Sequence, residues 1–486
     1  MPNHNTRYKV LLPILVVFGL VYASIALVNH YNFRTSAFDL GMFNHAVYSF
    51  SRFHSNIFTL DILNRGINYF ADHFSPITFL YVPFYWVFGS YGLLILQILA
   101  VLAGGLGLFR YMQNHTTQVA LPYIILVQFF CIWGIYTAVS FDFHNNVIAA
   151  MMLPWLIYLL DKEKLKQAAL LIFLMLMTKE NTGLWVAFVL AGMALRKQAF
   201  LLKKHTAFMI GVALFCAAYT FFVVDWLTPL LNQENKDGFQ LTRYAQYGNN
   251  LPEIAMYLLS HPSALKEIMI GPPDSLEYSI KMELYQAFLL SGGVAIIVRP
   301  YLLIWLIPVF AAKLLSKDFA FWGVSHHYSI EFVPILAFAV FEAINQFRGK
   351  IVQVTFAVVF VVLTCFTTIA LIDLSVIPMN KVNLRFYAGE HYRSGLNIKG
   401  VHEAIQHIPP GEPVSVHTNL APHMVEREKL YHFPVVNEAR YIILFETKRG
   451  SYPFPPDEYG DWINMFIKEK KFQVIYRKDD ILILKR

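Results

Sequence analysis

The sequence predicts a polytopic α-helical membrane protein with a small C-terminal α/β domain. Of its 486 residues, 56% are hydrophobic and only 15% are charged, whereas soluble domains carry roughly 25% charged residues. Mean hydropathy is +0.47. About eleven apolar runs alternate with polar loops, and from Leu384 onward the composition becomes that of a soluble domain. We therefore expect a transmembrane domain over residues 1–383 and an outer-face soluble domain over residues 384–486.

The first apolar run, about 10–28, follows Arg7 and Lys9. It is long enough to span a bilayer and longer than the core of a secretory signal, so we interpret it as a retained first helix. The other runs that we expect to span are about 91–109, 119–138, 146–160, 167–178, 183–195, 206–226, 284–298, 301–315, 328–347 and 352–376.

The apolar run Ile77–Phe88 is left out of this set. It contains Pro83, ends at Gly89-Ser90 and is too short to cross alone, so we expect a re-entrant or interfacial helix. With the N-terminus inside, the short basic loops then all fall on the cytoplasmic side, as the positive-inside rule requires. These loops contain Arg110, residues 161–166, Arg196-Lys197, Lys203-Lys204, Arg299, Arg348 and Lys350.

This crossing count predicts a multi-pass protein of the cytoplasmic (inner) membrane with a cytoplasmic N-terminus. It places the large loop 29–76 and the C-terminal domain outside the cytoplasm. The net charge of +7 is explained by the basic loops, so we expect no nucleic-acid partner. Cys131, Cys216 and Cys365 lie in apolar runs and are interpreted as small core residues.

The C-terminal hundred residues alternate short strands with helices, which is typical of an α/β domain. The expected strands are 414–416, 441–444, 472–475 and 481–484, and the expected helices are 401–407 and 458–470. The segment Thr418–His423 follows a strand, where α/β folds place ligand-facing loops. We favour the alternative, a structural turn built on Asn419 and Pro422.

The loop 29–76 carries the most conspicuous polar residues. Asp39 stands in Phe-Asp-Leu-Gly, and a carboxylate among apolar neighbours is costly unless it is paired or used. The alternative is that Asp39 caps a helix over 40–50. The same loop contains Arg34, Asp72 and His73, and all of it is predicted outside.

Further ionisable residues end helices on the same predicted side, and such residues at membrane depth suggest function. They are Asp142, His144, Lys179, Glu180, His326 and His327. Each has a plainer alternative. Asp142 and His144 could form an interfacial anchor with an Asp cap, and Lys179 could pair with its neighbour Glu180. Adjacent side chains diverge, so we expect only one of His326 and His327 to face a site.

These groups suit one reaction. A sugar arrives on a polyprenyl phosphate, whose lipid keeps the donor in the bilayer. A carboxylate takes the proton of an acceptor hydroxyl, and cationic groups or a metal stabilise the leaving phosphate. We assign the base to Asp39. Phosphate or substrate binding is assigned to Arg34, Asp72, His73, His144, Lys179, Glu180, His326 and His327. Asp39 and Asp142 are the candidate ligands of a divalent cation, Mg²⁺ or Mn²⁺.

The layout resembles the GT-C glycosyltransferases, and the local motifs resemble an uncharacterised bacterial multi-pass family placed in that superfamily. The matching stretches are Phe38–Gly41, His73–Pro76, Phe141–His144, Lys179–Asn181 and the closing segment near Pro422-His423. The resemblance implies a GT-C-like bundle with Asp39 as the acidic residue of the first outer loop. It also matches Asp72-His73 to the second acidic site of that loop and Asp142 to the acid after the third helix. Asn181 departs from the pattern, where an acid is expected.

No Trp-Trp-Asp acceptor motif is present, so peptide N-glycosylation is not expected and the acceptor, a glycan or a lipid, stays open. An alternative from another class is a non-catalytic transport or assembly protein with the same fold. Charges gathered at helix ends argue against a transport path. An intramembrane metalloprotease using His326, His327 and Glu331 is disfavoured because no His-Glu-x-x-His spacing exists.

Overall fold

The computed structural model describes residues 4–55, 57–196, 204–231, 241–446, 451–470 and 472–486. The chain forms two compact units. Unit 1 comprises residues 1–22, 72–76 and 97–384, and unit 2 comprises residues 23–71, 77–96 and 385–486. Two basic residues of the crossing count, Lys197 and Lys203, lie outside the described residues, as do residues 232–240 of the loop predicted over 227–283.

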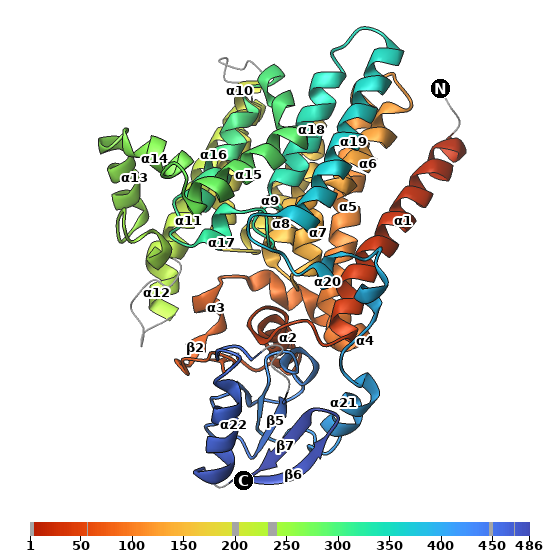
Figure 1. The fold of residues 1–486 in the computed structure, drawn as a ribbon. Helices are drawn as coiled ribbons and strands as arrows, with labels where there is room; N and C mark the ends of the chain where they lie inside the picture. Colours follow the sequence, from red (N-terminus) through yellow and green to blue (C-terminus); the bar gives the residue numbers. More distant parts are fainter. Residues whose placement is uncertain (1–3, 56, 197–203, 232–240, 447–450, 471) are drawn as a thin grey trace. The chain divides into compact units, whose positions relative to one another are not determined.

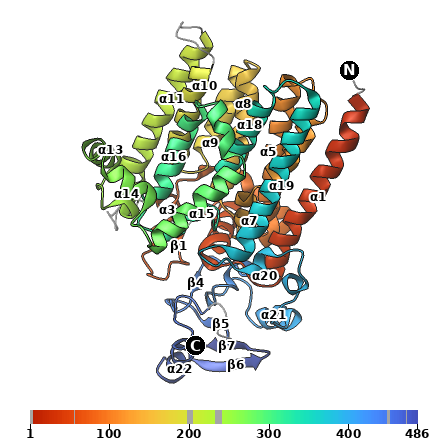
Figure 2. The same ribbon diagram turned by 45° about the horizontal axis from the view of Figure 1, so that its top comes forward.

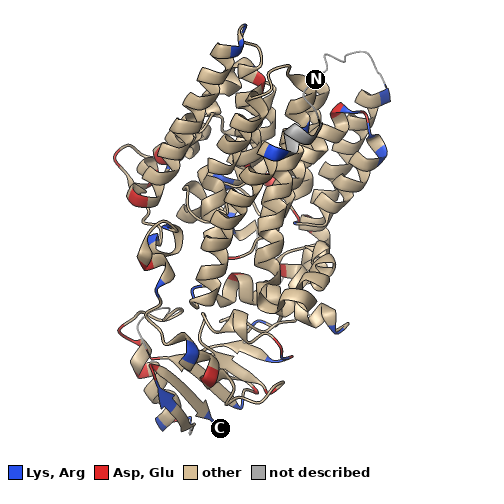
Figure 3. Ribbon diagram, turned by 90° about the vertical axis from the view of Figure 1, so that its right-hand side faces the viewer, with Lys and Arg blue, Asp and Glu red and all other residues tan. Residues whose placement is uncertain are grey.

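Unit 1 is helical, and most of its helices lie side by side in two views (Figure 1 and Figure 2). They carry few charged residues (Figure 3), because a helix in lipid satisfies its own backbone and exposes only apolar side chains. The α-helices with residues in unit 1 are α1 (His4–Tyr31), α5 (Gly92–His115), α6 (Leu121–Cys131), α7 (Trp133–Ser140), α8 (Asn145–Asp161), α9 (Leu165–Leu176), α10 (Thr182–Arg196), α11 (Lys204–Phe222), α12 (Thr228–Leu231), α13 (Leu251–Ser260), α14 (Ala264–Ile270), α15 (Leu276–Leu290), α16 (Leu302–Leu314), α17 (Phe319–Trp322), α18 (Phe332–Ile344), α19 (Lys350–Leu374) and α20 (Lys381–Leu384).

Several described helices are long and apolar enough to cross a membrane. They are Lys9–Tyr31, Pro76–His115, Lys204–Leu231 and Lys350–Leu374, and α6 with α7 makes a fifth if this pair, bent by 43°, is one span. Shorter apolar helices are Asn145–Asp161, Leu165–Leu176, Thr182–Arg196, Leu251–Ser260, Leu302–Leu314 and Phe332–Ile344. The chain is thus a membrane protein with several apolar helices, and the count of eleven spans stays a prediction.

The expected span 284–298, like the bent pair in 119–138, is not a single helix. The run 284–298 divides into the end of α15 and a 3-10 helix, η6 (Gly293–Val298). The break falls at Gly292, whose φ is +125° and where a β-carbon would lie 2.5 Å from Val340 Cγ2. Only glycine combines that backbone angle with that close approach, and the apolar composition of the run does not reveal it.

Small residues let α5 approach α8 closely. A β-carbon on Gly104 would lie 2.8 Å from Met151 Sδ, and one on Gly107 would lie 2.8 Å from Trp155 Cδ1. The Trp155 indole then donates a hydrogen bond of 2.8 Å to the carbonyl of Ala103. Such close backbone approach is how helices associate where lipid removes the hydrophobic driving force.

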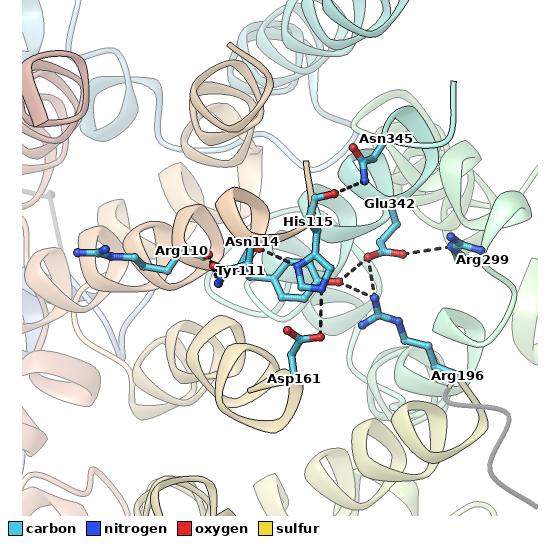
Figure 4. A network of polar contacts seen from close by, with 9 residues as sticks. All are labelled: Arg110, Tyr111, Asn114, His115, Asp161, Arg196, Arg299, Glu342 and Asn345. Carbon is cyan, nitrogen blue, oxygen red and sulfur yellow. Dashed lines mark hydrogen bonds and ion pairs between the residues drawn. The ribbon is translucent and has the colours of Figure 1, made fainter. Parts of the chain in front are cut away.

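The helices α5, α8, α10 and α18 all end at one polar network (Figure 4). Its centre is Glu342, which is 7% exposed. One oxygen accepts from Tyr111 Oη at 2.5 Å and from Arg196 at 2.9 Å, and the other accepts from Arg299 Nε at 3.1 Å. His115 Nε2 lies 3.1 Å from Asp161. Loops that the crossing count assigns to one side of the membrane therefore meet at one end of unit 1; which side that is stays a prediction.

Unit 2 combines an irregular N-terminal part with a five-stranded sheet. Its helical elements are the π-helix η1 (Ala37–Gly41), α2 (Met42–Ser51), α3 (Tyr69–Asp72), η2 (Pro76–Tyr81), α4 (Val82–Phe88), η3 (Gly89–Tyr91), η7 (Gly389–Tyr392), α21 (Ile398–Ile405), η8 (Ala421–His423) and α22 (Tyr459–Lys468). Its strands are β1 (Ile57–Phe58), β2 (Ile67–Asn68), β3 (Val414–Val416), β4 (Leu430–His432), β5 (Tyr441–Phe445), β6 (Gln473–Lys478) and β7 (Ile481–Lys485).

The sheet order is β4-β3-β5-β7-β6. Strands β4, β3 and β5 are mutually parallel, and β7 and β6 are antiparallel to their neighbours. β5 is buried at every residue, as a central strand covered on both faces requires. The four expected strands and two expected helices are present. β4 is a fifth strand that the sequence analysis missed, because three residues carry too little pattern.

The run 77–88 does not continue straight into α5. A β-carbon on Gly92 would lie 2.7 Å from the carbonyl oxygen of Phe84, eight residues earlier, whereas eight residues of straight helix span about 12 Å. The chain turns back at Gly89, whose φ is +55°. Trp86 and Val87 are exposed, and the re-entrant or interfacial position of this helix stays a prediction.

Candidate functional site

In unit 1, four segments bring polar side chains together. They are residues 72–76, the turn 141–144 between α7 and α8, the turn 177–181 between α9 and α10, and the segment 323–331 before α18. The last three lead into the starts of α8, α10 and α18, so the site and the Glu342 network lie at opposite ends of these helices. We call this group the unit 1 cluster: His73, His144, Lys179, Glu180, His326 and His327.

Gln97 of α5 holds the turn 141–144 by both ends of its amide. Its Nε2 donates to the carbonyl of Asp142 at 2.8 Å, and its Oε1 accepts from the amide of His144 at 2.9 Å. Asp142 is 7% exposed and has a φ of +60°. The N-cap residue of α8 is His144, so Asp142 is not the cap that the plainer alternative required.

The imidazoles of His144 and His327 stack with centroids 3.5 Å apart. His326 has a φ of +59°, and both rings, not one alone as expected, lie beside Phe141, with centroid distances of 4.1 Å for His326 and 6.0 Å for His327. The pKa of His327 lies well below its ordinary value because of burial, then because of the nearby charges of His144, Lys179, His326 and His73. His327 is therefore neutral at pH 7, and its buried Nδ1 has no hydrogen-bond partner among the described residues.

His73 and Glu180 lie far apart in the sequence but close together in unit 1. His73 Nδ1 lies 3.7 Å from Glu180 Oε1, and its Nε2 lies 3.8 Å from Asp72 Oδ2. Burial alone would raise the pKa of Glu180, but the nearby His73 imidazole and the charge of Lys179 outweigh it and hold that pKa at about 2. Glu180 is paired with His73, and Lys179 makes no ion pair within 4 Å in the described chain. The alternative of a Lys179–Glu180 pair is not observed.

This arrangement predicts an acid sensitivity. The pKa of Glu180 is below its unfolded value of about 4.5, so its ionised form stabilises the fold above pH 4.5, and that contribution is lost as the pH falls from 4.5 toward 2. The loss is on the order of 3 kcal/mol. Unfolding in detergent should show stability falling more steeply over this pH window in wild type than in Glu180→Gln. Parallel curves for the two proteins would contradict the assignment.

Lys313, Asn146 and Gln97 hold the segments that carry the unit 1 cluster, and the sequence analysis did not single them out. Lys313 is 2% exposed. Its Nζ donates to the carbonyls of Gly323 and Tyr328 at 3.0 and 3.1 Å and lies 3.3 Å from Ser329 Oγ, so it holds the segment that carries His326 and His327. A lysine inside the apolar run 301–315 was the available signal.

Asn146 ties the same segment to α8. Its Nδ2 lies 3.1 Å from Glu331 Oε1 and 3.4 Å from the carbonyl of His327. Nothing in the sequence distinguishes this asparagine from a residue in an ordinary first helical turn.

In unit 2, Asp39 lies inside the π-helical turn η1, which leads directly into α2. The N-cap of η1 is Ser36 and that of α2 is Gly41, so Asp39 is not the helix cap of the plainer alternative. Isolated π-turns occur frequently at functional sites. Arg34 donates to the carbonyls of His391 and Arg393 at 2.8 and 2.7 Å, which fixes its side chain; its substrate-binding role stays a prediction.

Metal binding was predicted for Asp39 and Asp142. These residues belong to different units. Within the described ranges, no three His, Cys, Asp or Glu side chains are grouped as ligands, and metal binding by Asp39 and Asp142 stays a prediction. The histidines and Glu331 of the protease alternative likewise form no such group. The unit 1 cluster, with an unpaired ammonium and a neutral imidazole, suits an anion better.

The chain resembles a solved membrane-protein structure, the "Crystal Structure of ArnT from Cupriavidus metallidurans bound to Undecaprenyl phosphate". The alignment covers 99% of this chain and 98% of that chain, with a TM-score of 0.57 and 11% sequence identity. At this identity the likeness shows the fold alone. The resemblance predicted from the sequence is therefore confirmed at the level of the fold.

A search of curated proteins found no relative. The family described as "Predicted membrane protein (DUF2079)" matches residues 29–452. Because this match covers most of the chain, the protein belongs to that family.

Proposed function

We propose that the protein transfers a sugar from a polyprenyl-phosphate donor to a glycan or lipid acceptor at the outer face of the cytoplasmic membrane. The observation that carries the proposal is the Lys179 ammonium, which has no ion pair in the described chain and acts electrostatically on Glu180 and His327. Placing a half-buried cation at the end of apolar helices costs free energy unless an anion pairs with it.

The leaving phosphate of the donor supplies that anion. Lys179 acts as a point charge on a phosphate oxygen, and His327 Nδ1 donates a hydrogen bond to another. Glu180 is already engaged by His73, so it orients the imidazole instead of repelling the phosphate. The solved neighbour is described as bound to undecaprenyl phosphate, which supports a polyprenyl phosphate as the ligand class for this shared fold.

The reaction itself is a substitution at the anomeric carbon. The acceptor hydroxyl oxygen forms a bond to that carbon, the bond from the carbon to the phosphate oxygen breaks, and the polyprenyl phosphate leaves with the electron pair. Asp39 takes the hydroxyl proton as general base. The proposed reaction does not require a divalent cation. Binding of Mg²⁺ or Mn²⁺ stays a prediction, which turnover with each metal and with chelator tests.

The assay is turnover of a panel of radiolabelled polyprenyl-phosphate sugars by the purified protein in nanodiscs. Each donor is tested with Mn²⁺, with Mg²⁺ and with chelator. Release or transfer of sugar by the wild type establishes the transferase, and the chelator arm decides whether a cation takes part. Absence of turnover of every donor by well-folded protein would oppose the proposal and favour the alternative, a non-catalytic transport or assembly protein with this fold.

Replacing Lys179 tests the phosphate site directly. Lys179→Met removes the charge and keeps the length of the side chain, so affinity for undecaprenyl phosphate should fall about 10- to 100-fold, the value of one hydrogen bond to a charged group. The matched control is Lys166→Met, at the other, exposed end of α9. Binding is measured with undecaprenyl phosphate titrated into nanodiscs. Equal affinities of the two variants would remove Lys179 from the site.

A further inference from the structure

The carboxyl ends of the parallel strands in unit 2 are occupied by the chain's own residues. The segment after β3 leads to β4 on one side, and the chain after β5 leads to β6 and β7 on the other. Between β3 and β5 the connections thus depart in opposite directions, which is where open α/β sheets bind their ligands. Here that position contacts residues 33–41, the segment that contains Asp39.

Two hydrogen bonds join the β3 loop, residues 417–423, to this segment. The amide of Ala37 donates to Thr418 Oγ1 at 3.3 Å, and Asn419 Nδ2 donates to the carbonyl of Thr35 at 3.0 Å. Thr35 and Thr418 are both buried. These bonds cross more than 380 residues of sequence, and all four residues belong to unit 2.

The Thr418 hydroxyl takes the place of a helix cap for η1. The first amides of a helix have no partner inside the helix and need an acceptor. Ser36, the N-cap residue of η1, makes no side-chain capping bond. The first amide of the π-turn, that of Ala37, is satisfied instead by the remote hydroxyl of Thr418. The hydrogen bond from Ala37 to Thr418 therefore fixes the first residue of the π-turn that contains Asp39.

Apolar and ring contacts reinforce the two bonds. A β-carbon on Gly41 would lie 3.4 Å from Ala421 Cβ. The ring of His423 stacks on His30 at 4.0 Å and lies 4.1 Å from Phe33. Beyond the turn, His45 of α2 donates from Nε2 to the carbonyl of Arg427 at 3.0 Å. The segment is held on both sides of Asp39.

We infer that the C-terminal sheet of this protein is a positioning device for Asp39, with Thr418 and Asn419 as the positioning residues. The Asp39 segment packs at the position between β3 and β5 where open α/β sheets bind their ligands. The catalytic meaning of this positioning rests on the proposed transferase function, whereas the physical coupling of the β3 loop to the π-turn does not.

Hydrogen exchange of the full-length protein in nanodiscs tests the coupling without any activity. Thr418→Val keeps the side-chain shape and removes the hydroxyl, so amide exchange over residues 37–41 should rise by up to about tenfold, the effect of one lost hydrogen bond on a local opening. Thr418→Ser should restore the protection. The matched control is Ser415→Ala in β3, because the buried Ser415 hydroxyl has no hydrogen-bond partner among the described residues.

In the double variant Thr418→Val/Asn419→Leu, amide exchange over residues 37–41 should rise further than in the single variant. The melting midpoint of the double variant is measured as well, to show that the protein stays folded. Unchanged exchange over residues 37–41 in both variants would overturn the inference. If the wild type transfers sugar, Thr418→Val should also lower kcat about tenfold or more without changing affinity for undecaprenyl phosphate, since small displacements of a catalytic group are costly. If the wild type transfers nothing, the proposed function fails and the exchange result still decides the positioning.

Discussion

Asp39→Asn is expected to lower sugar transfer by a factor of about 10²–10⁴, the usual contribution of a general base. Asparagine has nearly the shape of aspartate, so the π-turn of residues 37–41 should persist. Its amide cannot accept the proton of the acceptor hydroxyl, however. Affinity for undecaprenyl phosphate should be unchanged, because phosphate binding is assigned to the unit 1 cluster. The measurement is kcat and KM with the donor that the panel identifies, beside a binding titration with the lipid phosphate.

The control for this variant is Asp457→Asn, which changes an exposed carboxylate in the same unit and should leave transfer intact. A fall in lipid-phosphate affinity with an unchanged kcat would reassign Asp39 from base to binding residue. Full activity of Asp39→Asn would exclude it from the chemistry and return the turn to the plainer interpretation of a structural element.

Glu342→Gln should destabilise the helical unit by about 3 kcal/mol. This side chain is the common acceptor for Tyr111, Arg196 and Arg299, and removing one member of a buried ion pair leaves the other charges without compensation, at about 3–5 kcal/mol. We take the lower end because Arg299 is 36% exposed and regains water. Denaturant or thermal unfolding in detergent measures the change, with Glu342→Gln compared directly with wild type.

The comparison variant is Glu412→Gln, which breaks the exposed pair with Arg440, 3.3 Å apart and 68% exposed at the arginine. Exposed pairs contribute less than about 1 kcal/mol, so the two glutamates should differ clearly. A double-mutant cycle with Arg196→Met should also show coupling, because the single Glu342→Gln change leaves the partly buried Arg196 without its carboxylate. Equal stability losses at Glu342 and Glu412 would show that the network at the helix ends contributes no more than a surface pair.

Composition and local pattern determined the class of this protein and predicted the candidate site residues of unit 1. The excess of apolar residues indicates a membrane protein by itself, because helices that face lipid need apolar side chains on their outer surface. Ionisable residues at the ends of such runs are conspicuous, and the sequence therefore predicts His73, His144, Lys179 and His327 as site residues, whereas Lys313 inside the run 301–315 is recognised only from its contacts. Strands such as Tyr441–Phe445 were predicted because a continuous buried run has its own signature.

Only the tertiary structure decided which of these residues pair and what holds them. Glu180 pairs with His73 instead of its neighbour Lys179, and Lys313 holds the His326-His327 segment through backbone carbonyls, which have no sequence signature. The break at Gly292 depends on the position of Val340, and the cap of the Asp39 turn comes from Thr418. Sequence pattern reports the free energy of burying single side chains, whereas hydrogen bonds between distant segments exist only after the chain has folded.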